Sequence, residues 1–143
     1  MSKSQRFQFA ELKNAADLYR KLEHDFEVLQ KSEDPYAAFN FFVTAEHFPD
    51  WTNQRNPHVK AQWFLRVVSH IANGAKHLEV DRHDAVTGTE KQRYVEKGYV
   101  EEGYFQEPFL IHLAPAEAQD YGKPSVEAVT LGKMVMAFWK PYA

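Results

Sequence analysis

The sequence contains no cysteine. This absence excludes disulfide bonds, a thiolate nucleophile and the cysteine-ligated zinc sites that hold many small domains together. The fold must therefore depend on buried side chains. A chain of 143 residues is long enough for this, because it can bury roughly two thirds of the surface that its unfolded form exposes. With 44% hydrophobic and 15% aromatic residues, we expect one domain over residues 1–143 with an aromatic core.

Long apolar runs are also missing. Residues 1–20 are interrupted by charges throughout, so they lack the continuous apolar segment of a signal peptide. No segment approaches the ~20 apolar residues that a membrane-spanning helix needs. We therefore expect a cytoplasmic protein with no membrane partner.

The chain has no strong charge of one sign, because 17 basic residues face 20 acidic ones and the net charge is -3. Such a balance gives no general attraction to a phosphate backbone. Nucleic-acid binding would need a local basic patch, and we regard it as possible but do not favour it.

Several well-defined catalytic motifs are absent from the sequence as well. It contains no GxSxG elbow, no Walker loop, no dinucleotide fingerprint and no HExxH pair. Phosphate-cradling nucleotide chemistry is therefore not expected, and we expect no cofactor.

What the sequence does contain is a run of helical patterns in its first half. Apolar residues recur every three or four positions from about Phe9 to Lys31, which indicates an amphipathic helix. The stretch Pro35 to Phe48 is apolar on nearly every side, so it is expected in the interior as a second helix that ends at Phe48-Pro49-Asp50. A third helix is predicted from Pro57 to about His77, passing through Gly74.

The second half mixes strand and turn signals. The segment Phe109–Ala114 is a buried strand between two prolines, and a short strand at about 126–129 can pair with it. A further short strand is possible at 78–80, and residues 116–124 are expected to form a loop. Thr130 can cap a final helix that ends before Pro141.

Together these patterns predict an α+β fold. Three N-terminal helices form an up-down bundle, a small antiparallel sheet or hairpin follows, and a C-terminal helix returns to the bundle. A five-residue quasi-repeat around Tyr94, Tyr99 and Tyr104 is expected to form a hairpin or a dimer contact. These tyrosines and Trp63 lie outside the apolar stripes, which favours a homo-oligomer.

One candidate ligand site lies on the second helix. Asn40, Thr44 and His47 are spaced by four and then three residues, so they form one polar line on an otherwise apolar helix. Such a line faces water, is buried with hydrogen-bonding partners, or contacts a ligand. An unpaired buried polar group costs about 1–3 kcal/mol, so partners are expected if the line is buried.

A second candidate site is the polar face of the third helix, which carries Arg66, His70, Asn73, Lys76 and His77 and no carboxylate. Imidazoles can transfer protons near neutral pH while Arg and Lys hold an anion, as in small ribonucleases. We take Arg66, His70 and His77 as candidate catalytic groups, and Asn73 and Lys76 as ligand contacts.

Two comparisons limit what this face can be. His70 and His77 are about 10 Å apart along the helix axis, which is too far to chelate one ion without help, so no metal site is expected. Ribonucleases of the HEPN family have four to six residues between an Arg and the His that follows it. Here only three residues separate Arg66 from His70, which departs from that pattern.

The segments DPYAAFNFFVTAEHFPDW at 34–51, IANGAKHL at 71–78 and FW at 138–139 resemble a group of small uncharacterised bacterial proteins of prophage or mobile gene cassette type. The resemblance implies an accessory gene product and transfers no catalytic residue. We therefore expect a binding or interaction domain whose partner is a protein or a small molecule. The alternative is a small metal-independent hydrolase or ribonuclease that uses the polar face of the third helix.

Overall fold

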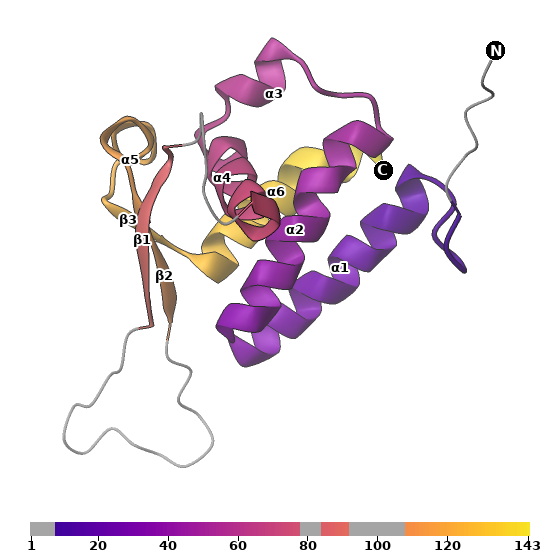
Figure 1. The fold of residues 1–143 in the computed structure, drawn as a ribbon, viewed down its shortest axis with the longest axis horizontal. Coiled ribbons are helices and arrows are strands. Elements are labelled where there is room, and N and C mark those ends of the chain that lie inside the picture. The colour runs from indigo at the N-terminus through magenta and orange to yellow at the C-terminus, as the bar shows by residue number, and fades with distance from the viewer. Residues whose placement is uncertain (1–7, 78–83, 92–107) are drawn as a thin grey trace.

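The computed structural model describes residues 8–77, 84–91 and 108–143. They form helices and a three-stranded antiparallel sheet, which confirms the α+β fold class and the C-terminal helix (Figure 1). The elements in chain order are α1 Ala15–Ser32, α2 Pro35–Trp51, α3 Pro57–Ala61, α4 Trp63–His77, β1 Val86–Lys91, β2 Phe109–Leu113, α5 Pro115–Tyr121, β3 Ser125–Glu127, α6 Ala128–Trp139 and the 3-10 helix η1 Lys140–Tyr142.

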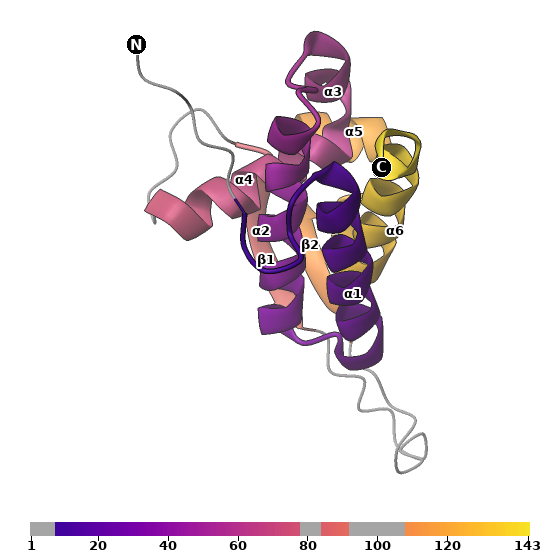
Figure 2. The same ribbon diagram turned by 90° about the vertical axis from the view of Figure 1, so that its right-hand side faces the viewer.

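The helices and the sheet share one hydrophobic core. The helices α1 and α2 form an antiparallel pair, and the sheet stands on the other side of the molecule (Figure 1). Helix α6 contacts α1, α2, α4, β2 and β3, so it joins the helical layer to the sheet. Helix α4 is seen nearly end-on in Figure 1 and from the side in Figure 2, so it crosses α2 rather than lying along it.

Helix α1 begins later than its apolar pattern predicts. The Asn14 side chain accepts a 2.9 Å hydrogen bond from the Asp17 N–H and caps the helix, whereas Phe9 and Leu12 pair with each other in an isolated bridge. The start predicted near Phe9 is therefore wrong, because a side-chain cap outcompetes the apolar spacing. Of the apolar residues that predicted this helix, Leu22 and Leu29 are buried, and Tyr19 and Phe26 are half-buried against the core.

Helix α2 begins as predicted, with Asp34 as its cap and Pro35 in the first turn, but its predicted end is wrong. The helix passes through Pro49 to Trp51. Proline removes only its own N–H donor, and the last turn is completed by other bonds. The Phe48 carbonyl accepts from the Thr52 N–H at 3.0 Å, and the Pro49 carbonyl accepts from the Gln54 N–H at 2.7 Å.

The predicted third helix is divided at Gln62. This residue is extended, with φ -78° and ψ 115°, so α3 and α4 are separate helices. Asn56 caps α3 by accepting a hydrogen bond from the Val59 N–H at 3.0 Å. Helix α4 continues past Gly74 to His77, as predicted.

The sheet has the order β1-β2-β3, and β2 is its central strand. Ile111 of β2 pairs with Thr89 of β1 and Val126 of β3, and its side chain is fully buried. Strand β1 was not predicted, because VTGTEK has the composition of a turn and pairs with a described strand on one side only. The possible strand at 78–80 lies outside the described residues.

Two predictions near the C-terminus are corrected. Residues 116–124 were expected to be a loop, but Pro115–Tyr121 is helix α5, and it ends at Gly122 in the left-handed region with φ 89°. The final helix starts at Ala128 with Glu127 in the cap position, so Thr130 is not its cap. The tyrosine repeat at 94–108 falls almost entirely outside the described residues.

The core is aromatic, as the composition predicts. Phe41, Phe42, Phe48 and Trp139 are fully buried, and the rings of Phe48 and Trp139 lie 5.2 Å apart. Trp63, which lies outside the predicted apolar stripes, is buried with its ring 4.7 Å from that of Tyr121. In the described ranges no helix is both long and apolar enough to cross a bilayer.

Candidate functional site

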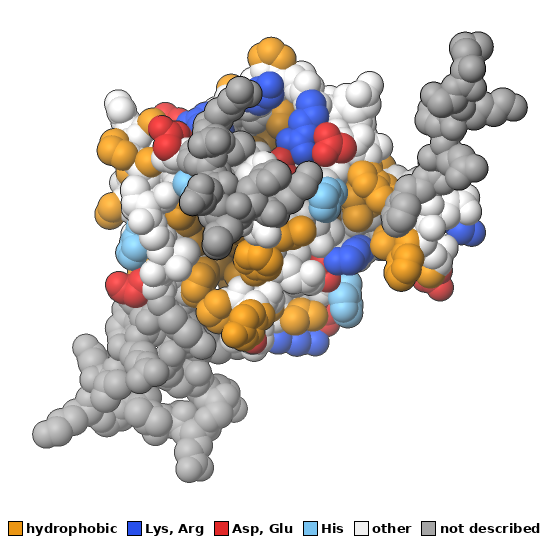
Figure 3. Space-filling model, in the orientation of Figure 1, with side chains coloured by type: hydrophobic (Ala, Val, Ile, Leu, Met, Phe, Trp, Pro, Cys, Tyr) orange, Lys and Arg blue, Asp and Glu red, His pale blue; other side chains and the backbone are white. Residues whose placement is uncertain are grey.

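A cleft of about 700 Å³ lies between α2, α3 and α4 on one side and the segments leading into β1 and α5 on the other. We call it the α4 cleft, because four residues of that helix line it. Its lining residues are Glu46, Arg55, Val59, Lys60, Leu65, Arg66, Ser69, Asn73, Asp84, Ala85, Ala114, Pro115, Ala116 and Glu117. Basic and acidic side chains lie side by side below α3 in Figure 3. The size of the cleft is in the range of small-molecule sites.

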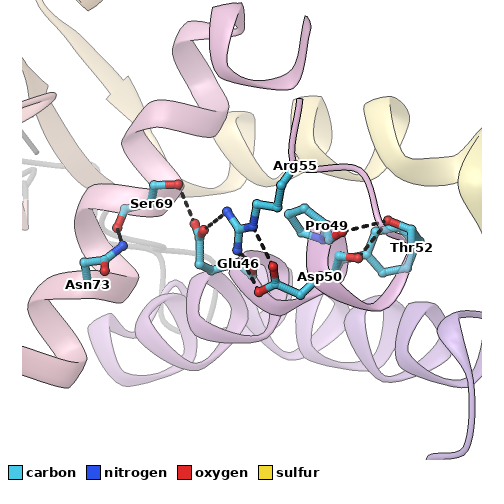
Figure 4. Close-up of polar contacts among 8 residues, drawn as sticks. Glu46, Pro49, Asp50, Thr52, Arg55, Ser69 and Asn73 are labelled. Carbon is cyan, nitrogen blue, oxygen red and sulfur yellow. Dashed lines mark hydrogen bonds and ion pairs between the residues drawn. The ribbon is translucent and has the colours of Figure 1, made fainter. Parts of the chain in front are cut away.

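Arg55 organises one wall of the cleft. Its guanidinium forms a forked pair with Asp50, with Nε–Oδ1 at 2.8 Å and Nη2–Oδ2 at 2.9 Å, and it also contacts the Glu46 carboxylate (Figure 4). Nη2 donates to the Glu46 carbonyl at 2.7 Å. The hydrogen bonds with Asp50 and then Glu46 raise the pKa of Arg55, and those from Arg55 lower the pKa of Asp50. Arg55 is thus fixed as a cation between two carboxylates.

Helix α4 meets this wall through Ser69. The Ser69 hydroxyl donates a 2.6 Å hydrogen bond to Oε2 of Glu46, and the Asn73 amide nitrogen donates to the Ser69 carbonyl at 2.8 Å (Figure 4). Both carboxylate oxygens of Glu46 are therefore engaged, one by Arg55 and one by Ser69. The result is a preformed polar surface that runs from the end of α2 to the middle of α4.

The opposite wall is held by Arg66. Nε donates to Glu117 at 2.8 Å and Nη2 to Asp120 at 2.9 Å, while Nη1 donates to the Ala61 carbonyl at 3.0 Å. Burial disfavours the charge of Arg66, but its bonds to Glu117 and Asp120 outweigh this effect and raise its pKa. Glu117 is only 4% exposed, so Arg66 compensates a buried carboxylate and fixes α5 against α4.

Two further charged residues stand at the rim. Lys60 and Asp84 are exposed, and neither forms an ion pair with any residue in the described ranges. The lining also includes apolar residues, among them Val59, Leu65 and Ala114. The cleft therefore combines apolar surface with polar groups that are fixed by bonds to one another, as ligand sites usually do.

The structure brings some of the predicted site residues together and separates others. Arg66 and Asn73 line the α4 cleft, whereas Asn40, Thr44 and His47 do not. Asn40 and His47 are exposed. Arg66 is held by carboxylates and carbonyls, so its guanidinium is not directed at an open anion site.

The two histidines of the predicted catalytic set have different outcomes. His70 does not line the cleft, and its Nδ1 accepts a 3.1 Å hydrogen bond from the Val86 N–H, which attaches β1 to α4. The side chains of Lys76 and His77 are not among those described. A catalytic role for His70 and His77 therefore stays a prediction.

Thr44 has a structural environment of its own. Its hydroxyl is buried and lies 2.9 Å from Oδ2 of Asp25 and 3.0 Å from the Asn40 carbonyl. Nζ of Lys21 lies 2.6 Å from the same Asp25 oxygen and 3.0 Å from the Thr44 hydroxyl. The middle of the predicted polar line thus joins α2 to α1.

A second polar group lies on the sheet. Nδ1 of His112 is 2.7 Å from the Ser125 hydroxyl, and its Nε2 is 3.9 Å from the Glu90 carboxylate. His112 and Ser125 are cross-strand partners in the register of β2 and β3. None of these residues lines the α4 cleft, and neighbours of this kind are ordinary in a sheet.

Most of the charged cleft residues were not found from the sequence. Glu46, Asp50 and Arg55 do carry a signal, because an i, i+4 carboxylate pair at the end of a helix is followed closely by an arginine. The contact of Arg66 with Glu117 has no comparable signal, since 51 positions separate the two residues. It depends on how α5 packs on α4.

The chemistry that this arrangement supports is recognition by hydrogen bonds and charge. The Ser69 hydroxyl donates its hydrogen bond to a carboxylate that already contacts Arg55. Within the ranges described, no group of three or more His, Cys, Asp or Glu side chains is placed to hold a metal ion. Comparison of the chain with protein-family models, with curated proteins and with solved structures gives no match.

Proposed function

We propose that this protein is a binding domain that holds a small organic molecule in the α4 cleft. The observation that supports this most is the cleft itself, a space of about 700 Å³ whose polar groups are already fixed by bonds to one another. Such groups need little ordering when a ligand arrives, so more of the contact energy contributes to affinity. This agrees with the binding role expected from the sequence.

A cleft-blocking variant tests the proposal. Ala116 is exposed and lines the cleft, so Ala116→Trp should fill part of the space. Ala137 is exposed on α6 and does not line it, which makes Ala137→Trp a matched control. In ligand-observed NMR with a library of organic fragments, we expect binders that are lost with Ala116→Trp and kept with Ala137→Trp. A library without any such binder would contradict the proposal.

We also propose that the protein forms a homo-oligomer, and a different observation favours it. Tyr36 and Phe39, three residues apart on one face of α2, are exposed by 85% and 49%. Exposed apolar side chains that gather on one surface are typical of interfaces. Light scattering coupled to size exclusion should show an oligomer that Tyr36→Ser with Phe39→Ser dissociates. A clean monomer of the parent chain over a wide concentration range would contradict it.

The hydrolase or ribonuclease alternative stays a prediction. Arg66 would have to leave Glu117 and Asp120 to hold a phosphate, and that would leave a buried carboxylate without its partner. For this reason we favour binding over catalysis at the polar face of α4.

A further inference from the structure

The α4 cleft carries an inference about the chemical class of its ligand, which rests on the proposed function. We propose that the cleft takes an organic molecule with no net charge, in which an amide group is joined to an apolar part. Three features of the lining support this: the balance of its charges, the hydrogen-bonding atoms of Asn73 and Ser69 that remain available, and its apolar residues.

The charged side chains that line the cleft balance one another. Three are acidic and three are basic, namely Glu46, Asp84 and Glu117 against Arg55, Lys60 and Arg66. In each wall, one of these carboxylates already contacts one of these guanidinium groups. The other two charges, Lys60 and Asp84, are exposed at the rim and opposite in sign. The lining as a whole therefore favours neither sign of charge.

This balance disfavours a ligand with a net charge. Moving a charge from water into a cleft costs free energy unless a countercharge in the cleft pairs with it. An anion would have to displace a carboxylate from Arg55 or Arg66, and a cation would have to compete with these guanidinium groups for the carboxylates. The exposed charges at the rim contribute little, because water screens them. A molecule without net charge avoids this cost.

The side-chain amide of Asn73, which lines the cleft, has bonding capacity that no described residue uses. Its nitrogen donates one hydrogen to the Ser69 carbonyl at 2.8 Å. Because a carbonyl can only accept, this bond identifies the nitrogen end of the amide. The second N–H and the Oδ1 oxygen form no hydrogen bond within the described ranges. One donor and one acceptor on the same side chain are therefore available to a ligand.

The Ser69 hydroxyl is the other uncharged group. It donates its only hydrogen to Glu46, so its oxygen can only accept a hydrogen bond from a ligand. The two side chains together offer a ligand both a donor and acceptors, none of them charged. An amide matches this set, because its N–H groups donate while its carbonyl accepts. A few polar groups of this kind are enough to fix the orientation of a ligand in a pocket.

The apolar residues of the lining come from more than one element. Val59 belongs to α3 and Leu65 to α4, while Ala114 and Pro115 lie at the start of α5. A small polar molecule such as urea would gain little from this surface. A ligand with a ring or an alkyl part would cover it, and the apolar area removed from water would stabilise the complex.

The experiment compares probes that share one ring, namely benzamide, acetophenone, benzylamine and benzoate, each titrated into the full chain and followed by 1H–15N NMR. We expect benzamide to shift the amide signals of cleft residues such as Ser69 and Ala116. Acetophenone has a methyl group in place of the NH2 group, so it should bind about three- to tenfold more weakly, as for lost neutral hydrogen bonds. Benzylamine and benzoate should bind about tenfold more weakly than benzamide, because their charges have no free countercharge in the walls.

A pair of variants tests the contact with Asn73. Asn73→Leu keeps the size of the side chain and removes its donor and acceptor, so benzamide should bind about three- to tenfold more weakly. The matched control Gln30→Leu, on an exposed position of α1, should leave the affinity unchanged. In Asn73→Leu the affinities of benzamide and acetophenone should become similar. Their ratio is measured within one variant, so a general loss of stability does not change it.

Two results would overturn the inference: benzylamine or benzoate binding in the cleft as tightly as benzamide, or equal benzamide affinity in Asn73→Leu and the parent. If only charged fragments bind in the cleft and Ala116→Trp excludes them, the inference is refuted and the binding function stands. No cleft binder of any kind would refute both. N-acetylphenylalaninamide separates two sources of the amide. Tighter binding than benzamide assigns the amide to a peptide, weaker binding assigns it to a small molecule, and both outcomes support an amide ligand.

Discussion

A Cβ atom on Gly132 of α6 would lie 2.6 Å from Cε1 of Phe26 on α1. No ordinary contact is that short, so the two helices approach closely only because residue 132 has no side chain. Gly132 is buried, and the Phe41 ring also lies 3.4 Å from that Cβ position. The seam between the first and last helices is therefore set by one glycine.

We expect Gly132→Ala to destabilise the protein. Alanine favours a helix over glycine by about 1 kcal/mol, but the displaced ring should cost about 1–3 kcal/mol, so a net loss is predicted. The free energy of unfolding in urea measures it. In a Phe26→Leu background the ring is gone, and the same change should cost less; an equal cost in both backgrounds would contradict the proposed contact.

Replacing Thr44 by valine should destabilise the protein by about 1–2 kcal/mol, because buried Asp25 loses a hydrogen-bond donor. Thr44→Ser keeps the hydroxyl and should cost less. Thermal and urea unfolding give both values. If both variants are as stable as the parent and a ligand affinity changes instead, Thr44 belongs to a binding site after all.

The pair of Asp50 and Arg55 predicts a pH dependence of stability. Hydrogen bonds from Arg55 lower the pKa of Asp50 in the folded protein. Its contribution is therefore complete above the unfolded pKa, about 3.9 for aspartate, and is lost as the pH falls through the lower folded pKa. The difference in unfolding free energy between the parent and Asp50→Asn should be constant from pH 7 to 5 and shrink below pH 4. A difference that grows in acid would contradict this.

Arg66→Met should destabilise the protein by about 2 kcal/mol, because it leaves Glu117 buried without its charge partner. Amide hydrogen exchange should increase most in α5, which Arg66 holds against α4. Adding Glu117→Gln removes the unpaired charge and should restore part of the loss. The stability of Arg66→Lys is expected to lie between that of the parent and that of Arg66→Met. Lysine keeps the positive charge, but its amine cannot contact Glu117 and Asp120 with a planar fork.

The helices of the first half could be predicted because their apolar periodicity and caps agree. Pro35 after Asp34 marks a start that the structure confirms, and Leu22 and Leu29 of the predicted α1 stripe are buried. The end predicted at Pro49 was wrong because the Thr52 and Gln54 N–H groups complete the last turn of α2. The single helix predicted across Gln62 was wrong because the backbone of this residue is extended.

The candidate site was less predictable than the fold. Arg66 and Asn73 were chosen from one helix face, but what Arg66 does depends on Glu117 and Asp120, which belong to a helix expected to be a loop. The polar line of α2 could be seen in the sequence, while the partner of Thr44 on α1 could not. The spacing of residues in the sequence predicts which of them share a helix face, but it does not predict which other element packs against that face.

Gln62 illustrates how a residue that lines no site can create one. It is the single extended position between two helices, and it turns α3 away from the axis of α4 (Figure 1). If Gln62 were helical, α3 and α4 would form one straight helix. Val59 and Lys60 would then no longer line the α4 cleft beside Leu65. A screen for substitutions that alter ligand binding should therefore include Gln62, although this residue does not line the α4 cleft.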